Sequence, residues 1–339
     1  MVSRAIGLAA VGTAALAASR VRVPFALFGR RVPRALRPNT RLQGTDATAN
    51  LIPAPPRKGK VRIALVQLLV DADKDTNIER AGKAIAEAAA GGAQLVVLPE
   101  IWNSPYSNAS FPVAAEDVEG GESRTADALR GWAVEHGIYL VGGSIPERGE
   151  GGAVFNTSLV FGPDGSLLGK HRKLHLFDID IPDGIRFMES ETLTAGDSLT
   201  VVDTPLLRFG VGICYDLRFP ELAALYAARG VHAIVYPGAF NTVTGPLHWE
   251  LLQRARAVDN NLWVATASPA RDETSSYLAW GHSSLVDPSG KVVATTEHDP
   301  TIVYGEIDPE EVDRRRQFIP VLDQKRDDLY ALIDKTRAV

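Results

Sequence analysis

The feature that most constrains this sequence is an alternation of short apolar runs with longer segments of helical periodicity, which starts at residue 61. Val61–Leu68 (VRIALVQL) is typical of a buried strand, and Thr76–Ala90 has its apolar residues on one helical face. Leu95–Leu98 predicts a second strand, Ser123–His136 a second helix and Ile138–Gly142 a third strand. Strands that alternate with helices of this length predict an α/β protein.

The same pattern continues through the second half of the chain. Predicted strands and helices alternate at Leu206–Ile213, Glu221–Arg229, Ala233–Tyr236, Leu247–Val258 and Leu262–Ala267. Two hairpins are predicted across turns that contain Pro and Gly: Phe155–Phe161 with Leu167–Lys170, and His282–Asp287 with Lys291–Thr295. No linker or repeat interrupts residues 61–339, so we expect one domain there.

The first 60 residues differ from this domain in charge. Residues 1–42 contain eight Arg and no acid, the composition of mitochondrial and chloroplast transit peptides. Asn50–Lys60 contains three prolines and predicts a linker, so a chain that begins near Lys58 should keep a complete domain. We therefore expect residues 1–60 to be a targeting segment and linker, disordered or removed, and the mature protein to be organellar. A secretory signal around Ala5–Ala18 and a native extension of a cytoplasmic protein are the alternatives.

The charge balance excludes some classes of partner. Residues 1–60 have a net charge of +10 and the whole chain −5, which leaves −15 on residues 61–339. A domain this acidic lacks the excess of basic residues that binds nucleic acid or an anionic membrane surface. Cys214 is the only cysteine, so no intrachain disulfide can form, and a reducing compartment is favoured.

Three residues of complementary chemistry follow predicted strands. Glu100 and Cys214 each come after a buried strand, and Lys173 follows a hairpin. Reactive groups of α/β proteins collect at the carboxyl ends of strands. Each residue also has an ordinary interpretation, as a solvated cap, a small buried thiol or a surface amine. Together they supply the base, the nucleophile and the oxyanion stabiliser that amide cleavage without a metal requires.

The segments around these residues resemble the three motifs of the nitrilase superfamily, in the same order and at similar spacing. They are PE ending at Glu100, KLHLF beginning at Lys173 and GICYDLRFPE around Cys214. The similarity extends over residues 61–333 and is greatest to the omega-amidase branch. It implies a four-layer α-β-β-α sandwich, a homodimer, and an amidase without cofactor or metal ion. It also implies small-molecule substrates, 2-oxoglutaramate and 2-oxosuccinamate, whose terminal amide is hydrolysed.

A free thiol is mostly protonated at neutral pH, so a cysteine nucleophile needs a base. We assign that role to Glu100, which would take the proton of Cys214 as the sulfur attacks the amide carbon. Lys173 and the backbone N–H of Tyr215 would stabilise the oxyanion. By the resemblance, Glu189 in RFMES is a second glutamate that positions the substrate and Lys173.

The remote carboxylate of such a substrate requires a cation of its own. Arg218, four residues after Cys214, matches the omega-amidase position, and a guanidinium binds a carboxylate in bidentate fashion. A salt bridge from Arg218 to Asp216 or Glu221 is the alternative. The other residues expected to line the pocket are Phe240, Thr244 and Tyr106.

Other functions remain possible at this stage. A related carbon–nitrogen hydrolase, such as an amidase for deaminated glutathione or an N-carbamoyl hydrolase, would share the three reactive residues and differ in its pocket. A non-catalytic scaffold would be expected to lack one of the three, and none is missing. His171 and His175 are four residues apart, but the sequence has no HExxH or CxxC pattern, so we expect no metal site.

Replacing Cys214 by Ala or Ser is expected to abolish amidase activity and to leave the fold intact, because neither side chain offers the thiolate that forms a thioester. Steady-state rates and circular dichroism spectra of the two variants test this. A chelator should leave the wild-type rate unchanged. Rates within about tenfold of wild type in either variant would contradict the mechanism.

Overall fold

The computed structural model describes residues 52–182 and 186–336. The predicted transit peptide lies outside these ranges. Within them, no helix combines the length and the apolar character needed to cross a bilayer. The elements described below fall in the region predicted as one domain.

A seven-stranded sheet forms one half of the domain. Its strands are β1 (Val61–Gln67), β2 (Leu95–Val97), β3 (Tyr139–Val141), β4 (Ile145–Arg148), β5 (Val154–Phe161), β6 (Leu167–Arg172) and β15 (Thr301–Ile307). β1, β2 and β3 are parallel, and β15 pairs antiparallel with β1. β5 pairs antiparallel with β3, β4 and β6, so the first predicted hairpin is confirmed.

A six-stranded sheet forms the other half, in the order β14-β13-β12-β11-β10-β9. Its strands are β9 (Thr200–Asp203), β10 (Arg208–Val211), β11 (Ala233–Pro237), β12 (Trp263–Ala267), β13 (Ser284–Val286) and β14 (Val292–Thr295). β10, β11 and β12 are parallel, and β13 and β14 form the second predicted hairpin. A separate pair joins β7 (Asp178–Asp180) to β8 (Arg186–Met188).

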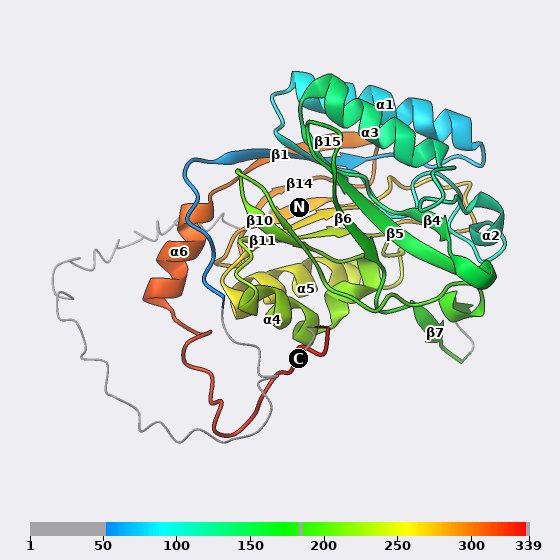
Figure 1. Cartoon of the computed structure of the whole chain (residues 1–339). Coiled ribbons are helices and arrows are strands. Elements are labelled where there is room, and N and C mark those ends of the chain that lie inside the picture. Colours follow the sequence, from blue (N-terminus) through cyan, green and yellow to red (C-terminus); the bar gives the residue numbers. More distant parts are fainter. Residues whose placement is uncertain (1–51, 183–185, 337–339) are drawn as a thin grey trace, which may run out of the picture. The chain divides into compact units, whose positions relative to one another are not determined.

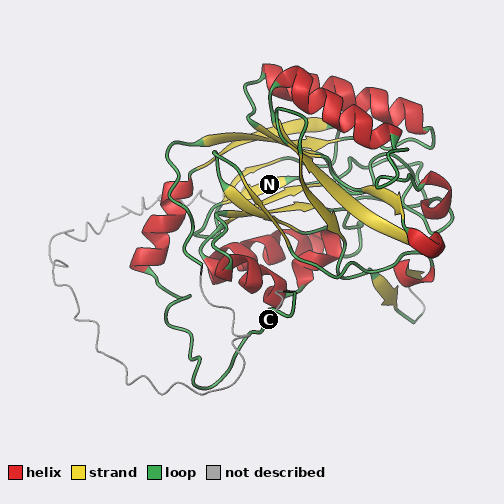
Figure 2. Cartoon of the chain, viewed as in Figure 1, coloured by secondary structure: helices red, strands yellow, loops and turns green. Residues whose placement is uncertain are grey.

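Helices cover the outer face of each sheet. α1 (Lys74–Ala90) and α3 (Arg124–His136) lie together on the first sheet, and α4 (Pro220–Ala228) and α5 (Gly245–Asn260) lie on the second (Figures 1 and 2). Two shorter helices are α2 (Phe111–Ala114) and α6 (Pro309–Phe318). The four layers are helices, sheet, sheet and helices, which confirms the predicted α-β-β-α sandwich.

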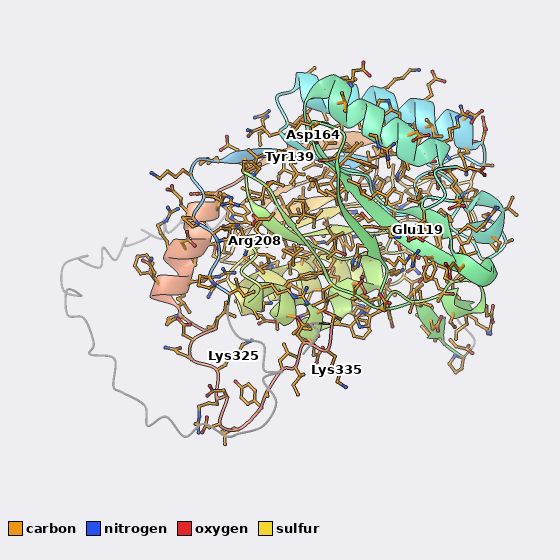
Figure 3. The ribbon with its side chains drawn as sticks, viewed as in Figure 1. Glu119, Tyr139, Asp164, Arg208, Lys325 and Lys335 are labelled. Carbon is orange, nitrogen blue, oxygen red and sulfur yellow. The ribbon has the colours of Figure 1, made fainter. Side chains whose placement is uncertain are left out.

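Three apolar cores lie between successive layers, where side chains fill the space from one layer to the next (Figure 3). β1 explains why its sequence is apolar throughout. Ile63 and Leu65 point into the core between the sheets, whereas Ala64 and Val66 point into the core beneath α1 and α3. Because both faces of the strand are buried, the sequence shows a continuous apolar run instead of an alternation.

Local signals in the sequence set the ends of the outer helices. The Asp73 carboxylate accepts a hydrogen bond from the Asp75 N–H at the start of α1, and the Ser123 hydroxyl accepts one from the Ala126 N–H at the start of α3. Gly91 ends α1, as predicted. Gly137 ends α3 with φ of 63°, a left-handed conformation that favours glycine.

The sequence analysis did not identify β15 or α6. β15 is an edge strand whose burial does not alternate, since only Val303 and Ile307 are buried. α6 has a predominantly charged sequence with only Pro309 and Val312 buried. Val312 nevertheless joins the core between the two sheets. Elements with so few buried residues give too weak a periodic pattern to be identified from sequence.

The predicted linker is wrong from Ile52 onward, because this segment packs on the domain. The Ile52 N–H donates to the Ala228 carbonyl at 2.7 Å, and Arg57 binds Asp203 at 2.6 Å. His232 donates from Nε2 to the Pro55 carbonyl at 3.0 Å. Burial lowers the pKa of His232 to about 4, so the ring is neutral and this N–H has a specific partner. Proline-rich sequence predicted a flexible linker, but an extended chain also fits a groove.

A chain that begins at Ile52 should unfold at the same temperature as the full-length protein, whereas one that begins at Lys58 should unfold several degrees lower. The shorter chain loses the contacts of residues 52–57, and each lost hydrogen bond costs roughly 0.5–1.5 kcal/mol. Thermal unfolding followed by circular dichroism tests this. Equal midpoints for both truncated chains would show that the segment contributes nothing.

Candidate active site

The four residues predicted to be catalytic come together where strands of both sheets end. Glu100 follows β2 of the first sheet, and Cys214 follows β10 of the second at the start of the 3₁₀ turn Cys214–Arg218. Lys173 follows β6, and Glu189 follows β8. The three charged side chains are fully buried, and Cys214 is only 4% exposed. Two sheets therefore supply one site.

A close backbone approach holds the loop that carries Glu100. Gly143, with φ of 63°, lies so near that loop that an added Cβ would be 2.1 Å from the Pro99 carbonyl oxygen. The next residue, Ser144, donates its N–H to the same oxygen at 3.1 Å. Its hydroxyl accepts from the Ile101 N–H at 3.1 Å. Only glycine fits at residue 143, and the loop is fixed on both sides of Glu100.

Lys173 lies between two carboxylates. Its Nζ donates to Glu100 Oε1 and to the Glu189 carboxylate, each at 2.9 Å. Burial alone would lower the pKa of Lys173, but the charges of Glu100 and then Glu189 raise it above its ordinary value. The ammonium therefore stays charged at neutral pH.

The two oxygens of Glu100 differ in their partners. Oε1 accepts from Lys173 and from Asn156 Nδ2, both at 2.9 Å. Oε2 has no hydrogen-bond partner among the described residues, and the Cys214 thiol is near enough to affect the pKa of Glu100. Burial and the neighbouring charge of Glu189 raise that pKa. The free oxygen is thus available to accept a proton.

The thiol of Cys214 is neutral in this environment. Burial, and then the charge of Glu100, raise its pKa well above the ordinary value, and Lys173 only partly opposes them. The Ala239 N–H donates to Sγ at 3.4 Å. The backbone of Cys214 has φ of 47°, a strained conformation for a non-glycine residue that is common at functional sites.

Asp216 holds this strained turn in place and connects it to the loop of Lys173. Its carboxylate accepts from the Ile213 N–H at 2.8 Å, just before the nucleophile. It also accepts from His175 Nδ1 at 2.7 Å and contacts His171 Nε2 at 3.4 Å, on either side of Lys173 in the sequence. Burial raises the pKa of Asp216, but the hydrogen bonds from the two histidines have the larger combined effect. The pKa therefore lies below its ordinary value, and the carboxylate is charged.

The histidines therefore have a partner that sequence spacing did not suggest. Within the described part of the chain, no cluster of three or more His, Cys, Asp or Glu side chains is placed to hold a metal ion. His175 also stacks on Phe219 with ring centroids 3.6 Å apart, which adds packing to its bond with Asp216.

Arg218 forms neither of the salt bridges considered as its alternative role. Asp216 is occupied by the two histidines, and no carboxylate lies within ion-pair distance of Arg218 among the described residues. Its Nη1 lies 3.2 Å from His248 Nδ1, and its Nε is buried without a partner. The guanidinium lies over the Phe240 ring at 4.8 Å and thus has unused donors beside an aromatic wall.

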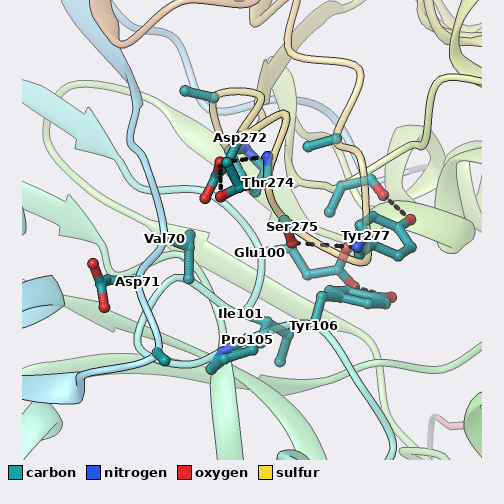
Figure 4. A pocket seen from close by; sticks show the side chains of 15 residues that line it. Val70, Asp71, Glu100, Ile101, Pro105, Tyr106, Asp272, Thr274, Ser275 and Tyr277 are labelled. Carbon is teal, nitrogen blue, oxygen red and sulfur yellow. Dashed lines mark hydrogen bonds between the residues drawn. The ribbon is translucent and has the colours of Figure 1, made fainter.

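Two cavities border the site. An inner cavity contains Cys214 and Arg218, and the remaining residues that line it are Phe177, Tyr215, Ala239, Phe240, Thr244 and Tyr277. An outer cavity of about 330 Å³ has Glu100 and Tyr106 in its lining (Figure 4). The structure therefore places the predicted residues Phe240 and Thr244 beside Arg218. Tyr106 lines the outer cavity instead, and its hydroxyl donates a hydrogen bond to the Glu189 carboxylate at 2.5 Å.

Three residues of the site were not predicted from the sequence: Asn156, Phe177 and Tyr277. Asn156 binds Glu100, and its position on a predicted strand gave no sign of this contact. The Phe177 N–H donates to Glu189 Oε2 at 2.7 Å, although Phe177 belongs to the KLHLF segment and could have been considered. Tyr277 lies in an irregular loop between β12 and β13, where no pattern distinguishes one residue from another.

The four-layer sandwich buries a thiol, a carboxylate and an ammonium together at one site. The chain belongs to the carbon–nitrogen hydrolase family, whose sequence profile matches residues 62–317. It is 58% identical to the chloroplastic omega-amidase of Arabidopsis thaliana over 288 residues. The aligned region covers 84% of this chain and 78% of that protein. It is 55% identical over 271 residues to the omega-amidase NIT2 of Homo sapiens, covering 80% and 97%.

Solved structures confirm the fold. Nit3 of Saccharomyces cerevisiae, a member of branch 10 of the nitrilase superfamily, matches with a TM-score of 0.75 and 46% identity, over 81% of this chain and 100% of that one. The C. elegans NitFhit protein matches with a TM-score of 0.76 and 34% identity, over 82% and 68%. The predicted family, fold and amidase class are thereby confirmed.

The raised pKa of Glu100 predicts that kcat/KM falls in acid at a pH above 4.5, the ordinary value for glutamic acid. The carboxylate must be ionised to accept the thiol proton, so the rate is lost as pH falls through this raised pKa. The charge of Lys173 should not limit the rate on the alkaline side, since its pKa is also raised. A pH–rate profile tests both statements. An acid limb at or below the ordinary carboxyl value would assign the base elsewhere.

Proposed function

We propose that the chain is an omega-amidase, which hydrolyses the terminal amide of small dicarboxylate monoamides such as 2-oxoglutaramate and 2-oxosuccinamate. The observation that carries this proposal is Arg218, whose guanidinium shares a cavity with the Cys214 thiol and lacks a carboxylate partner among the described residues. A substrate with a carboxylate at one end and an amide at the other fits this arrangement. Its carboxylate pairs with Arg218, and its amide is the group that Cys214 attacks. The A. thaliana and H. sapiens relatives are named omega-amidases, which supports the same activity.

Formation of the thioester needs a single proton carrier. The thiol proton passes to Glu100 Oε2 as the sulfur of Cys214 bonds to the amide carbon. The tetrahedral intermediate then breaks its C–N bond, and Glu100 gives the proton to the leaving nitrogen. Ammonia leaves, and the acyl group stays on sulfur.

Water completes the reaction through the same carboxylate. Glu100 takes a proton from water as the water oxygen bonds to the thioester carbon. The C–S bond then breaks, and the proton returns to the sulfur of Cys214. The products are the 2-oxo dicarboxylic acid and one ammonia, and both catalytic groups regain their starting protonation.

Lys173 and the Tyr215 N–H stabilise the oxyanion of both intermediates. Two N–H bonds of Lys173 are held by carboxylates, and the remaining contact of its Nζ, with the Tyr106 hydroxyl, is long at 3.5 Å. One N–H can therefore turn toward the substrate oxygen. A single donor of this kind is typically worth roughly 3 kcal/mol. Glu189 positions Lys173, because it is itself fixed by hydrogen bonds from Tyr106 and the Phe177 N–H.

The assembly and location of the protein also belong to this proposal. α5 exposes a stripe of apolar side chains, Leu247, Leu251 and Val258, each about half exposed or more. Such a stripe supports a homodimer formed through α5. The A. thaliana relative is named chloroplastic, which supports import into an organelle after removal of the predicted transit peptide. Residues 61–339 would then form the catalytic domain of the mature protein, with residues 52–57 packed on it.

Arg218→Ala should lower kcat/KM on 2-oxoglutaramate by roughly 10- to 100-fold, the range expected for a hydrogen-bonded charge. Arg218→Lys should also lower it, because an ammonium does not reproduce the bidentate fork. A neutral amide of the same length, which has no carboxylate to bind, should be affected little by either change. Steady-state kinetics on both substrates is the measurement. An equal loss on both would mean that Arg218 supports the nucleophile turn and not the carboxylate.

A further inference from the structure

The inner and outer cavities divide the catalytic residues between them. Cys214 and Arg218 line the inner cavity, and Glu100 lines the outer one. Of the residues that the structure describes, two line both cavities, Ala239 and Tyr277. Ala239 has a single-carbon side chain, so the side chain that separates the two spaces is the ring of Tyr277.

The separation matters because the cavities differ greatly in size. The outer cavity measures about 330 Å³ and the inner one about 10 Å³. About 10–15 Å³ on this scale is the space that one water molecule occupies. The acyl group of a substrate therefore enters the inner cavity only when one of its walls moves.

Tyr277 is a wall of both cavities that comes from a partly exposed loop. Its hydroxyl donates to the Ala239 carbonyl, and its ring stacks on Tyr106 with centroids 4.5 Å apart. It lies in the loop between β12 and β13, where residues 273, 274 and 276 are exposed. The Tyr277 ring also contacts the Phe187 ring, with centroids 6.1 Å apart. One side-chain hydrogen bond and two ring contacts are individually weak, so the ring can rotate out of its position. Phe240, by contrast, is 4% exposed and belongs to a core cluster with Cys214 and Trp249.

We propose that Tyr277 is a specificity-determining residue, a movable partition that limits the size of the acyl group admitted beside Cys214. The assignment of acyl group and leaving group to the two sides rests on the proposed function, whereas the partition itself does not. The acyl group occupies the inner cavity with its carboxylate on Arg218. Ammonia leaves, and water enters, through the outer cavity, where Glu100 carries the proton.

The single cysteine allows a test of the partition that needs no substrate. Iodoacetamide and iodoacetanilide alkylate a thiol by the same step, in which sulfur bonds to carbon, iodide leaves and the thiol proton is released. They differ by one phenyl ring. Rates of Cys214 alkylation, followed by mass spectrometry and divided by the rates with free cysteine, report how much space each reagent finds.

Tyr277→Ala should speed the reaction with iodoacetanilide by about tenfold or more, with a much smaller change for iodoacetamide. Tyr277→Phe keeps the ring and should keep the wild-type selectivity. Phe187→Ala is the matched control, because Phe187 packs against the Tyr106 and Tyr277 rings but lines neither cavity. If Tyr277→Ala leaves the selectivity unchanged, or if Phe187→Ala changes it equally, the partition is overturned.

Steady-state kinetics then separates this proposal from the function. Tyr277→Ala should shift the ratio of kcat/KM toward monoamides with longer acyl chains, with Tyr277→Leu as a second variant if the folded fraction of the Ala variant falls. A changed alkylation selectivity without any dicarboxylate monoamide activity in the wild type would refute the omega-amidase assignment and keep the partition. Activity on the short substrates with no shift in either assay would refute the partition alone.

Discussion

The charge of one buried ammonium determines the electrostatics of the whole site. Lys173 is fully buried, and so are the two glutamates that it bridges. Without the ammonium, two carboxylates would repel each other where burial already penalises their charge. With it, the cluster of Lys173, Glu100 and Glu189 retains one net negative charge when all three are ionised. Burial, and then the charge of Glu100, raise the pKa of Cys214, and the ammonium of Lys173 only partly opposes them.

A second buried charge gives the site its geometry. Asp216 is fully buried and joins the turn of Cys214 to the loop of Lys173 through hydrogen bonds to Ile213 and His175. The turn has a strained backbone at Cys214, which persists only where the surroundings fix it. Because Asp216 is used here, Arg218 forms no ion pair with it, and the Arg218 Nε is buried without a partner. The stability of the nucleophile turn and the substrate preference proposed for the enzyme thus depend on the same residue.

Much of the fold and of the site could be predicted from sequence. β1 and α1 have strong, regular apolar patterns, and β15 and α6 were missed because few of their residues are buried. Glu100, Lys173 and Cys214 were predicted as site residues by motif resemblance, and the structure brings their side chains together. Residues 52–57 were misjudged because a proline-rich composition describes the flexibility of a free chain and not whether a groove exists to receive it.

By itself the sequence determined the α/β class and the family, and it proposed three reactive residues, because periodicity and short motifs are local properties. Only the tertiary structure decided which partners those residues have. Asp216 was a possible partner of Arg218 along the chain, yet it binds histidines more than forty residues away. Tyr277 reaches the site from an irregular loop without any motif. Contacts between distant segments depend on how two sheets meet face to face, and no local pattern records that arrangement.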